Sequence, residues 1–250
     1  MDIFPSYVTI GKIFEQNFLF EVPKYQRYYA WEDEQVDDFI RDISALIRNH
    51  NSKDHFFGGI VCVEKPVPGS NRQQRELVDG QQRITTTMLL ILSVYKKYGE
   101  ILSQTSDEDI TTIVKKRREK IERKYINYED EINRKPVVVR HLMVSQADEE
   151  CYEAIISGAP KVGVRDSHKK MNKAYEKLFT FVSRSADERA DCNEKINVLA
   201  DIEDVIDKCC TIIFIDAKTK RDAYALFQVL NDRGMGLTVG DLLKSKTLEI

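Results

Sequence analysis

The sequence predicts an α+β fold, in which a small mixed sheet is combined with a helical subdomain. Apolar runs of strand length occur on both sides of the chain's middle, at residues 18–22, 55–63 and 209–215. Between the last two runs, the helical periodicity of residues 145–208 predicts three helices. We therefore expect the final strand to return to a sheet begun near the N-terminus.

Composition limits the class of protein. The chain has 250 residues, 42% of them hydrophobic, which is enough for a core. Its 38 Lys and Arg nearly balance its 41 Asp and Glu, so the net charge of −3 gives no general argument for nucleic-acid binding. With no signal peptide and no apolar run of bilayer length, we expect a soluble cytoplasmic protein without a membrane partner. Five scattered cysteines predict buried free thiols, and four scattered histidines lack zinc-ligand spacing.

Residues 1–100 hold most of the expected sheet. Helical spacing in residues 8–14 predicts a short helix, and a second helix is expected over residues 32–49. Residues 76–78 are the expected partner strand of residues 55–63. The apolar stripe that follows predicts a helix laid against the core over residues 84–98.

Polar chemistry gathers at the turn before that last helix. Arg83 and Thr85 fall in its first turn, where unpaired N–H groups and the helix dipole favour an anion, and where both side chains offer donors to a phosphate. The GxxxxGK[ST] spacing of a Walker A loop is absent. The turn is therefore either a phosphate cradle or an Asp-Gly turn leading into a core helix. Its residues are Asp79, Gly80, Gln81, Gln82 and Arg83.

A second polar box lies on the expected loop after Pro23, which biases the preceding residue to an extended conformation. Tyr25 and Gln26 are candidates to bind a nucleotide or to read a base. If Arg27 approaches the turn, its guanidinium and that of Arg83 can together neutralise a triphosphate. We expect the other aromatic residues of the box to pack: Tyr28, Tyr29 and Trp31.

The concentrated basic run of the chain, residues 115–124, lies in an expected helix over residues 107–125. It is either a solvated helix face or a contact with a phosphate backbone. The second alternative makes four residues candidate DNA contacts: Lys115, Lys116, Arg117 and Arg118.

After a strand-like stretch at residues 135–142 and the three helices, the chain ends in a third box. Gly234 and Gly236 follow an expected helix and not a strand, which argues against a dinucleotide loop. Thr238 and Asp241 form a capping box, so another helix should start there. It reaches the last residue without a stop signal, and we expect a longer protein.

Three boxes in order resemble the N-terminal domain of the GmrSD-type family, proteins of modification-dependent (type IV) restriction and phage defence. Each box alone is a weak signal of the family, whereas all three in this order are specific. Together they span the chain, although the middle helices carry no recognised motif. The boxes are Pro23-x-Tyr25-Gln26-Arg27 with Trp31, Asp79-Gly80-Gln81-Gln82-Arg83, and Asn231-x-Arg233-Gly234-x-x-Leu237-x-x-x-Asp241-Leu-x-Lys244.

The resemblance implies a ParB/sulfiredoxin-like nucleotide-binding core in residues 1–100, a helical insertion in residues 101–208, and residues 209–250 completing the core. A C-terminal nuclease domain or partner usually follows in that family, and no nuclease motif is present in this sequence. The implied activity is hydrolysis of GTP or ATP with Mg²⁺, governing cleavage of modified phage DNA.

That implication assigns roles by residue. Asp79 and Arg83 become the catalytic residues, and Asp79 either holds Mg²⁺ or orients a water. Two alternatives stay open: a ParB-like DNA-binding module that never turns over nucleotide, and a fragment that is inert without its nuclease half. The implied nucleotide-binding residues are Tyr25, Gln26, Arg27, Gly80, Gln81, Gln82, Thr85, Asn231, Arg233 and Lys244.

Overall fold

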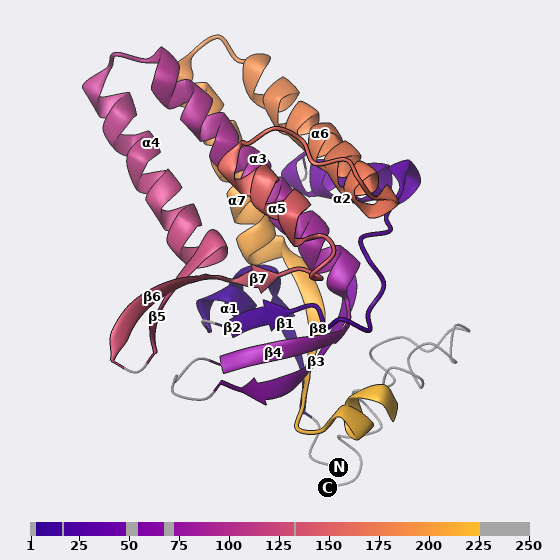
Figure 1. Cartoon of the computed structure of the whole chain (residues 1–250). Helices are drawn as coiled ribbons and strands as arrows, with labels where there is room; N and C mark the ends of the chain where they lie inside the picture. The colour runs from indigo at the N-terminus through magenta and orange to yellow at the C-terminus, as the bar shows by residue number, and fades with distance from the viewer. Residues whose placement is uncertain (1–3, 17, 49–54, 68–72, 133, 226–250) are drawn as a thin grey trace, which may run out of the picture.

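The structure, a computed structural model, describes residues 4–16, 18–48, 55–67, 73–132 and 134–225. Within these ranges the strands form one mixed sheet and a separate hairpin, and the longer helices stand together on one side of the sheet (Figure 1). The expected α+β class, with a mixed sheet and a helical part, is confirmed.

The main sheet has six strands, and most pairs of neighbouring strands, β3 and β4 excepted, are not consecutive in the sequence. The second strand in the order, β8 (Cys210–Ala217), lies between the N-terminal β1 and β3, antiparallel to β1 and parallel to β3. The expected return of the last strand is confirmed. The full order is β1 (Phe4–Thr9), β8, β3 (His55–Pro66), β4 (Gln73–Asp79), β2 (Phe18–Glu21) and β7 (Leu142–Met143).

The helical layer is built around α3 (Gln81–Gln104), which contacts α4, α6 and α7 along its length (Figure 1). Nearly every position in its first half is buried, as expected for a helix with neighbours on several sides. The other helices are α1 (Ile10–Glu15), α2 (Asp33–Arg48), α4 (Glu108–Ile121), α5 (Glu149–Ser157), α6 (Asp166–Asp187) and α7 (Cys192–Asp204).

One hydrophobic cluster fills the space between the sheet and these helices, and it takes residues from both ends of the chain and from the helices of residues 101–208. A smaller cluster covers the opposite face of the sheet, where Val61, Val78 and Ile215 pack together. The division at residues 100 and 208 stays a prediction, because a continuous core joins the segments on either side of it.

Several elements differ from expectation. The short helix expected over residues 8–14 begins at Ile10, because the preceding residues form β1. The hairpin strand β5 (Asn127–Ile132) was not predicted, since its polar sequence has no apolar alternation. Its partner β6 (Lys135–Arg140) matches the expected stretch. The helix expected before the third box is seen at residues 220–225, and its continuation lies outside the described residues.

Two π-helical turns join the helical layer to strands. The first, η1 (Glu122–Ile126), continues α4, and the second, η2 (Val205–Cys209), continues α7. The hydroxyl of Tyr125 donates to the carboxylate of Asp207, and Lys124 Nζ lies 3.1 Å from the same oxygen. Such turns often mark functional or strained positions, and here they bind the two helix ends to each other.

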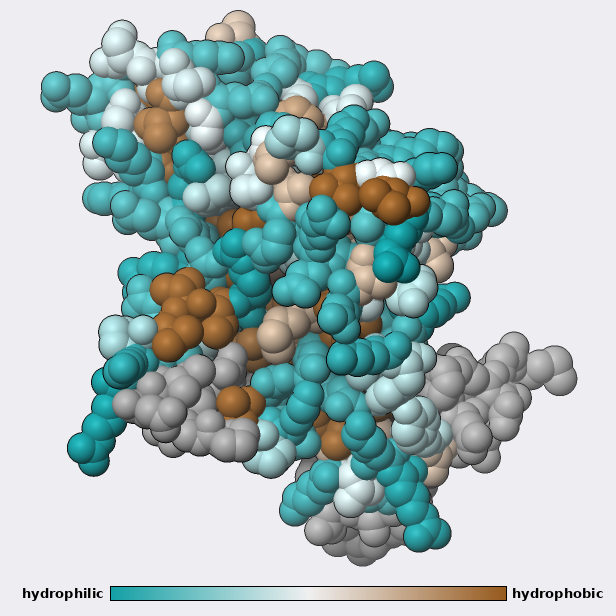
Figure 2. All heavy atoms as spheres, viewed as in Figure 1, coloured by the Kyte–Doolittle hydropathy of each residue, from teal (hydrophilic) through white to brown (hydrophobic). Residues whose placement is uncertain are grey.

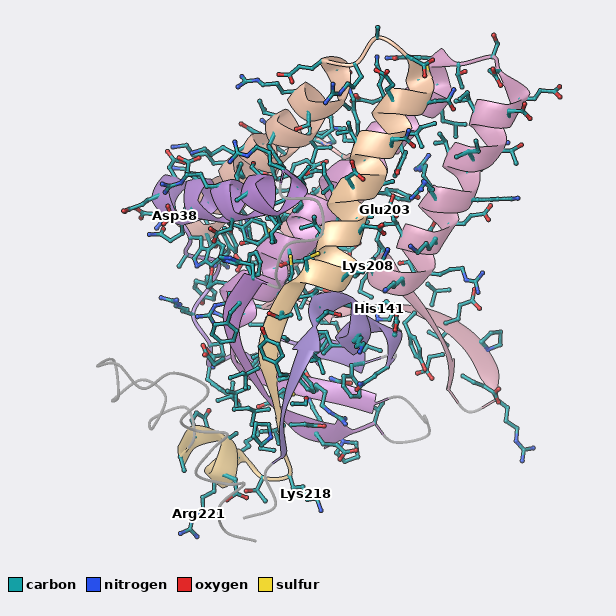
Figure 3. The ribbon with its side chains drawn as sticks, turned by 180° about the vertical axis from the view of Figure 1, so that it is seen from behind. Asp38, His141, Glu203, Lys208, Lys218 and Arg221 are labelled. Carbon is teal, nitrogen blue, oxygen red and sulfur yellow. The ribbon has the colours of Figure 1, made fainter. Side chains whose placement is uncertain are left out.

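A buried carboxylate connects three helices above these turns. Glu203 of α7 is 7% exposed and lies between α7 and α4 (Figure 3). It accepts a hydrogen bond from Tyr98 of α3 at 2.6 Å and another from Arg117 of α4 at 3.2 Å. Burial raises the pKa of Glu203 even though Tyr98, Arg117 and Lys120 favour its charged form.

None of the helices in the described part of the chain is both long and apolar enough to cross a membrane. The face shown in Figure 2 is mostly hydrophilic, with separate hydrophobic patches. All five cysteines are free; three are buried and the other two, Cys192 and Cys209, are partly exposed.

The Glu203 network yields a stability prediction. Glu203→Ala should lower the free energy of unfolding by about 1–3 kcal/mol, because it leaves the buried Tyr98 hydroxyl without its acceptor. The matched control is Asp204→Ala. It removes an exposed carboxylate that forms an ion pair with Lys208 and with no other described residue, and it should change that free energy by less than about 0.5 kcal/mol. Urea denaturation measures both, and equal losses would contradict the assigned role.

Candidate functional site

The predicted strand–turn–helix is confirmed: β4 ends at Asp79 and α3 begins at Gln81. Gly80 between them has a left-handed backbone, with φ of +89°. A Cβ there would lie 2.8 Å from the side chain of Ile60 and 2.9 Å from the carbonyl oxygen of Gly59. Gly80 brings no side chain to cap α3, and no other described side chain does so, which leaves the first N–H groups of this long helix suited to an anion.

Arg83 lies across the neighbouring strand β3. Its Nη1 donates to the carbonyl oxygen of Gly59 at 2.9 Å and is 3.8 Å from Asp79 Oδ2. A Cβ on Gly58 would stand 2.8 Å from Arg83 Nε, so the absence of a side chain there lets the guanidinium lie against the strand. The side chains of Arg83 and Asp79 are 39% and 35% exposed. Both charges therefore reach solvent at the start of α3.

Three predicted glutamines fasten the 23–31 loop to this junction. Gln81 Nε2 donates to the carbonyl oxygen of Arg27 at 2.6 Å, and Gln26 Nε2 donates to that of Val78 at 2.8 Å. Gln82 uses both ends of its amide, donating to the Tyr28 carbonyl and accepting from the Ala30 N–H. The structure thus brings the two predicted boxes together, and backbone contacts occupy most of these amide groups.

The aromatic side chains of the 23–31 loop differ in how far they are buried. Tyr29 is buried, and its hydroxyl lies 2.9 Å from that of Thr86, which confirms its packing role. Tyr28 was expected to pack, but its side chain is 48% exposed, and the guanidinium carbon of Arg165 lies 6.0 Å from the centre of its ring. Trp31 packs against the core while partly exposed. Arg27 is exposed beside Tyr28.

Asp148, which sequence reasoning missed, holds the loop from the helical side. Its carboxylate accepts from the Tyr29 N–H at 2.9 Å, from Ser145 at 3.0 Å and from Ser167 at 2.5 Å. Asp148 precedes α5, and the spacing of Ser145 and Asp148 was the available signal.

Glu76 and Lys220, which contact Tyr25, were also missed by sequence reasoning. The Tyr25 hydroxyl donates to Glu76, and Lys220 Nζ lies 2.6 Å from the same carboxylate oxygen. Burial, then the hydrogen bond to Glu76, raises the pKa of Tyr25. Burial by itself would raise the pKa of Glu76, but Lys220 and Tyr25 hold it below its ordinary value. The available signal was Glu76 itself, a charged residue in the strand expected over residues 76–78, since buried carboxylates require partners.

Of the remaining nucleotide-binding candidates, the structure describes only Thr85. Thr85 is buried in the first part of α3. Asn231, Arg233 and Lys244 lie outside the described residues. Within the described residues, no group of three or more His, Cys, Asp or Glu side chains is placed to hold a metal ion, and Asp79 is the carboxylate of the junction.

The basic run of α4 divides into two parts. Arg117 pairs with Glu203, and the guanidinium carbon of Arg118 lies 4.2 Å from the centre of the Tyr95 ring. Lys115 and Lys116 are exposed, with no carboxylate partner among the described residues. The first two serve the helical layer, and the two lysines are available to a partner.

The junction yields a second stability prediction. Gly80→Ala should lower the free energy of unfolding by about 2 kcal/mol or more, because a strained φ is combined with the clash against Ile60. Gly158→Ala is the control: Gly158 also has positive φ, at +70°, but no atom lies within 4 Å of its Cβ position, so about 1 kcal/mol is expected. Equal losses on urea denaturation would show that the contact with β3 is unimportant.

Comparison with known proteins identifies the family of the chain. Residues 10–248 match the family described as GmrSD restriction endonuclease, N-terminal domain. No curated protein matches the chain. The family match spans the loop, the β4–α3 junction and the helical layer, and it includes all three boxes of the sequence. The chain therefore belongs to the family of GmrSD restriction endonuclease N-terminal domains.

Proposed function

We propose that this domain binds a nucleoside triphosphate, GTP or ATP, with Mg²⁺ at the β4–α3 junction, and that hydrolysis there regulates a phage-defence restriction endonuclease. The observation that carries the proposal is the position of Arg83. Its guanidinium is oriented by the Gly59 carbonyl, is partly exposed, and stands at the uncapped start of α3. Helix N–H groups and an oriented guanidinium are donors that suit a phosphate.

The surrounding residues supply complementary roles. Arg27 offers a second guanidinium on a loop already fastened by Gln81 and Gln82, so little ordering is needed when phosphate binds. The third box, with Asn231, Arg233 and Lys244, is proposed to complete the phosphate shell, and Tyr25 to border it. Thr85 is proposed to contribute its hydroxyl after local adjustment, because it is buried in this structure.

Asp79 suits Mg²⁺ held jointly with phosphate. Mg²⁺ is commonly bound by one or two carboxylates, with substrate phosphates and water completing its shell, so a single half-exposed carboxylate is an adequate protein ligand. When bound, the metal would neutralise charge on the phosphates. Asp79 would hold it there or orient the attacking water.

A second candidate function is DNA binding without nucleotide turnover, with a ParB-like core as the expected framework. The exposed Lys115 and Lys116 of α4 favour it, because unpaired lysines suit a phosphate backbone. The net charge of −3 gives it no general support. In either case restriction endonucleases act on DNA, and modified phage DNA is the proposed partner, with a nuclease domain or subunit making the cut.

We expect Arg83→Ala to weaken nucleotide binding by about ten- to a hundredfold, because it removes a charge-assisted contact. Lys115→Ala, which removes a cation far along the chain from the junction, should leave the affinity unchanged. Isothermal titration with GTP and ATP measures both variants, with melting temperature as the check on folding. Unchanged affinity in folded Arg83→Ala protein would overturn the nucleotide site.

Asp79→Ala should separate binding from chemistry. If Asp79 holds Mg²⁺ or orients water, hydrolysis should be lost while metal-free nucleotide binds as well as before or more tightly, because a negative charge near the phosphates is gone. If Asp79 serves only the turn, stability should fall by about 0.5–2 kcal/mol and turnover per folded molecule should not change. Phosphate release, measured alongside titration with and without Mg²⁺, distinguishes these results.

A further inference from the structure

A cavity of about 300 Å³ lies among α3, α4, α5 and α6. One face of α3 provides Tyr95, Lys96 and Gly99, while Arg118 and Tyr175 come from α4 and α6. Figure 1 shows α3 between α4 and α6, with α5 alongside. Tyr95 is twelve residues beyond Arg83 on a straight helical path, about 18 Å at 1.5 Å per residue. The cavity is therefore separate from the β4–α3 junction.

Two cations and two aromatic rings border this cavity. Arg118 Cζ is 4.2 Å from the centre of the Tyr95 ring. Lys96 Nζ is 5.8 Å from the centre of the Tyr175 ring and 4.7 Å from that of Phe179, one turn further along α6. Neither cation has a carboxylate partner among the described residues. Glu100, the acid of the lining, pairs with Lys97 at 3.2 Å. The cavity thus combines unpaired positive charge with ring faces.

The Arg118 guanidinium also lacks any hydrogen-bond acceptor in the described part of the chain, and its Nε is buried. Buried donors without an acceptor are rare in folded proteins. The C-terminal end of α5 borders the cavity and would attract cations, but none of its carbonyl oxygens accepts from Arg118 or Lys96. The pattern fits a donor set that an external acceptor completes.

Gly99 supports this arrangement from inside α3. Glycine within a helix lowers helix stability relative to alanine, so its presence there calls for a local reason. A Cβ at Gly99 would lie 3.3 Å from Arg118 Nη1, closer than ordinary van der Waals contact. The missing side chain lets the guanidinium approach α3 next to the Tyr95 ring.

We propose that this cavity binds a small anion that carries a planar ring, of nucleoside monophosphate size or smaller. Its anionic group would accept from Arg118 and Lys96, and its ring would pack on the guanidinium plane or the tyrosine rings. A volume of about 300 Å³ stands at the lower end of small-molecule sites and suits a ligand of that size. The proposal does not depend on nucleotide turnover at the junction.

Isothermal titration of the 250-residue chain with AMP, GMP, CMP and UMP tests the site, and inorganic phosphate serves as the anion without a ring. At least one monophosphate should bind wild-type protein, and more tightly than phosphate does. Affinity should fall about tenfold or more in Arg118→Gln and in Lys96→Gln. Lys96 is exposed, so its variant should fold even if the Arg118 variant does not.

Two controls locate the binding. Lys115→Gln, an exposed cation on α4, and Arg83→Ala at the junction should leave monophosphate affinity unchanged. No binding at about millimolar ligand, or wild-type affinity in folded Lys96→Gln protein, would overturn the inference. Loss of monophosphate binding in Arg83→Ala would also overturn it, while locating that ligand at the junction and supporting the function proposed there.

Discussion

The left-handed backbone of Gly80 is the constraint on which the rest of the junction depends. It lets β4 stop and α3 begin within one residue, pressed against Gly59 and Ile60 of β3. A side chain there would push α3 away from β3. The hydrogen bond from Arg83 to the Gly59 carbonyl would then lengthen or break, and so would the hydrogen bonds of the glutamines to the 23–31 loop. The placement of both predicted boxes thus follows from one close approach between a helix and a strand.

From that point α3 links both layers of the domain. At its N-terminal end, beside Asp79 and Arg83, no described side chain caps the helix. Further along, α3 supplies Tyr98 to the buried Glu203 and one wall of the cavity among α3, α4, α5 and α6. A helix is stiff along its axis, so groups at its two ends keep a fixed separation. In this GmrSD restriction endonuclease N-terminal domain, the same helix therefore connects the proposed nucleotide site to the helical layer.

The parts that could be predicted from sequence are those with local causes. An Asp-Gly turn followed by a helical apolar stripe is sufficient to place β4 and α3, and the apolar run before residue 217 is sufficient for β8. The contacts of Gln26 and Tyr25 join residues about fifty positions apart, and no short-range pattern encodes them. The π-helical turns and the polar strand β5 lack a periodic signature, so packing decides them.

The position of β8 between β1 and β3 has a consequence for synthesis of the chain. Its partner β3 leaves the ribosome about 155 residues earlier, as the pairing of His55 with Cys210 shows. At about 5–20 residues per second, one edge of β3 stays unpaired for roughly 10–30 s. That edge carries the apolar run of residues 60–63, and an open apolar strand readily pairs with other chains. The nascent protein therefore passes through an aggregation-prone interval that ends only when β8 arrives, which makes a chaperone's protection most valuable before that moment.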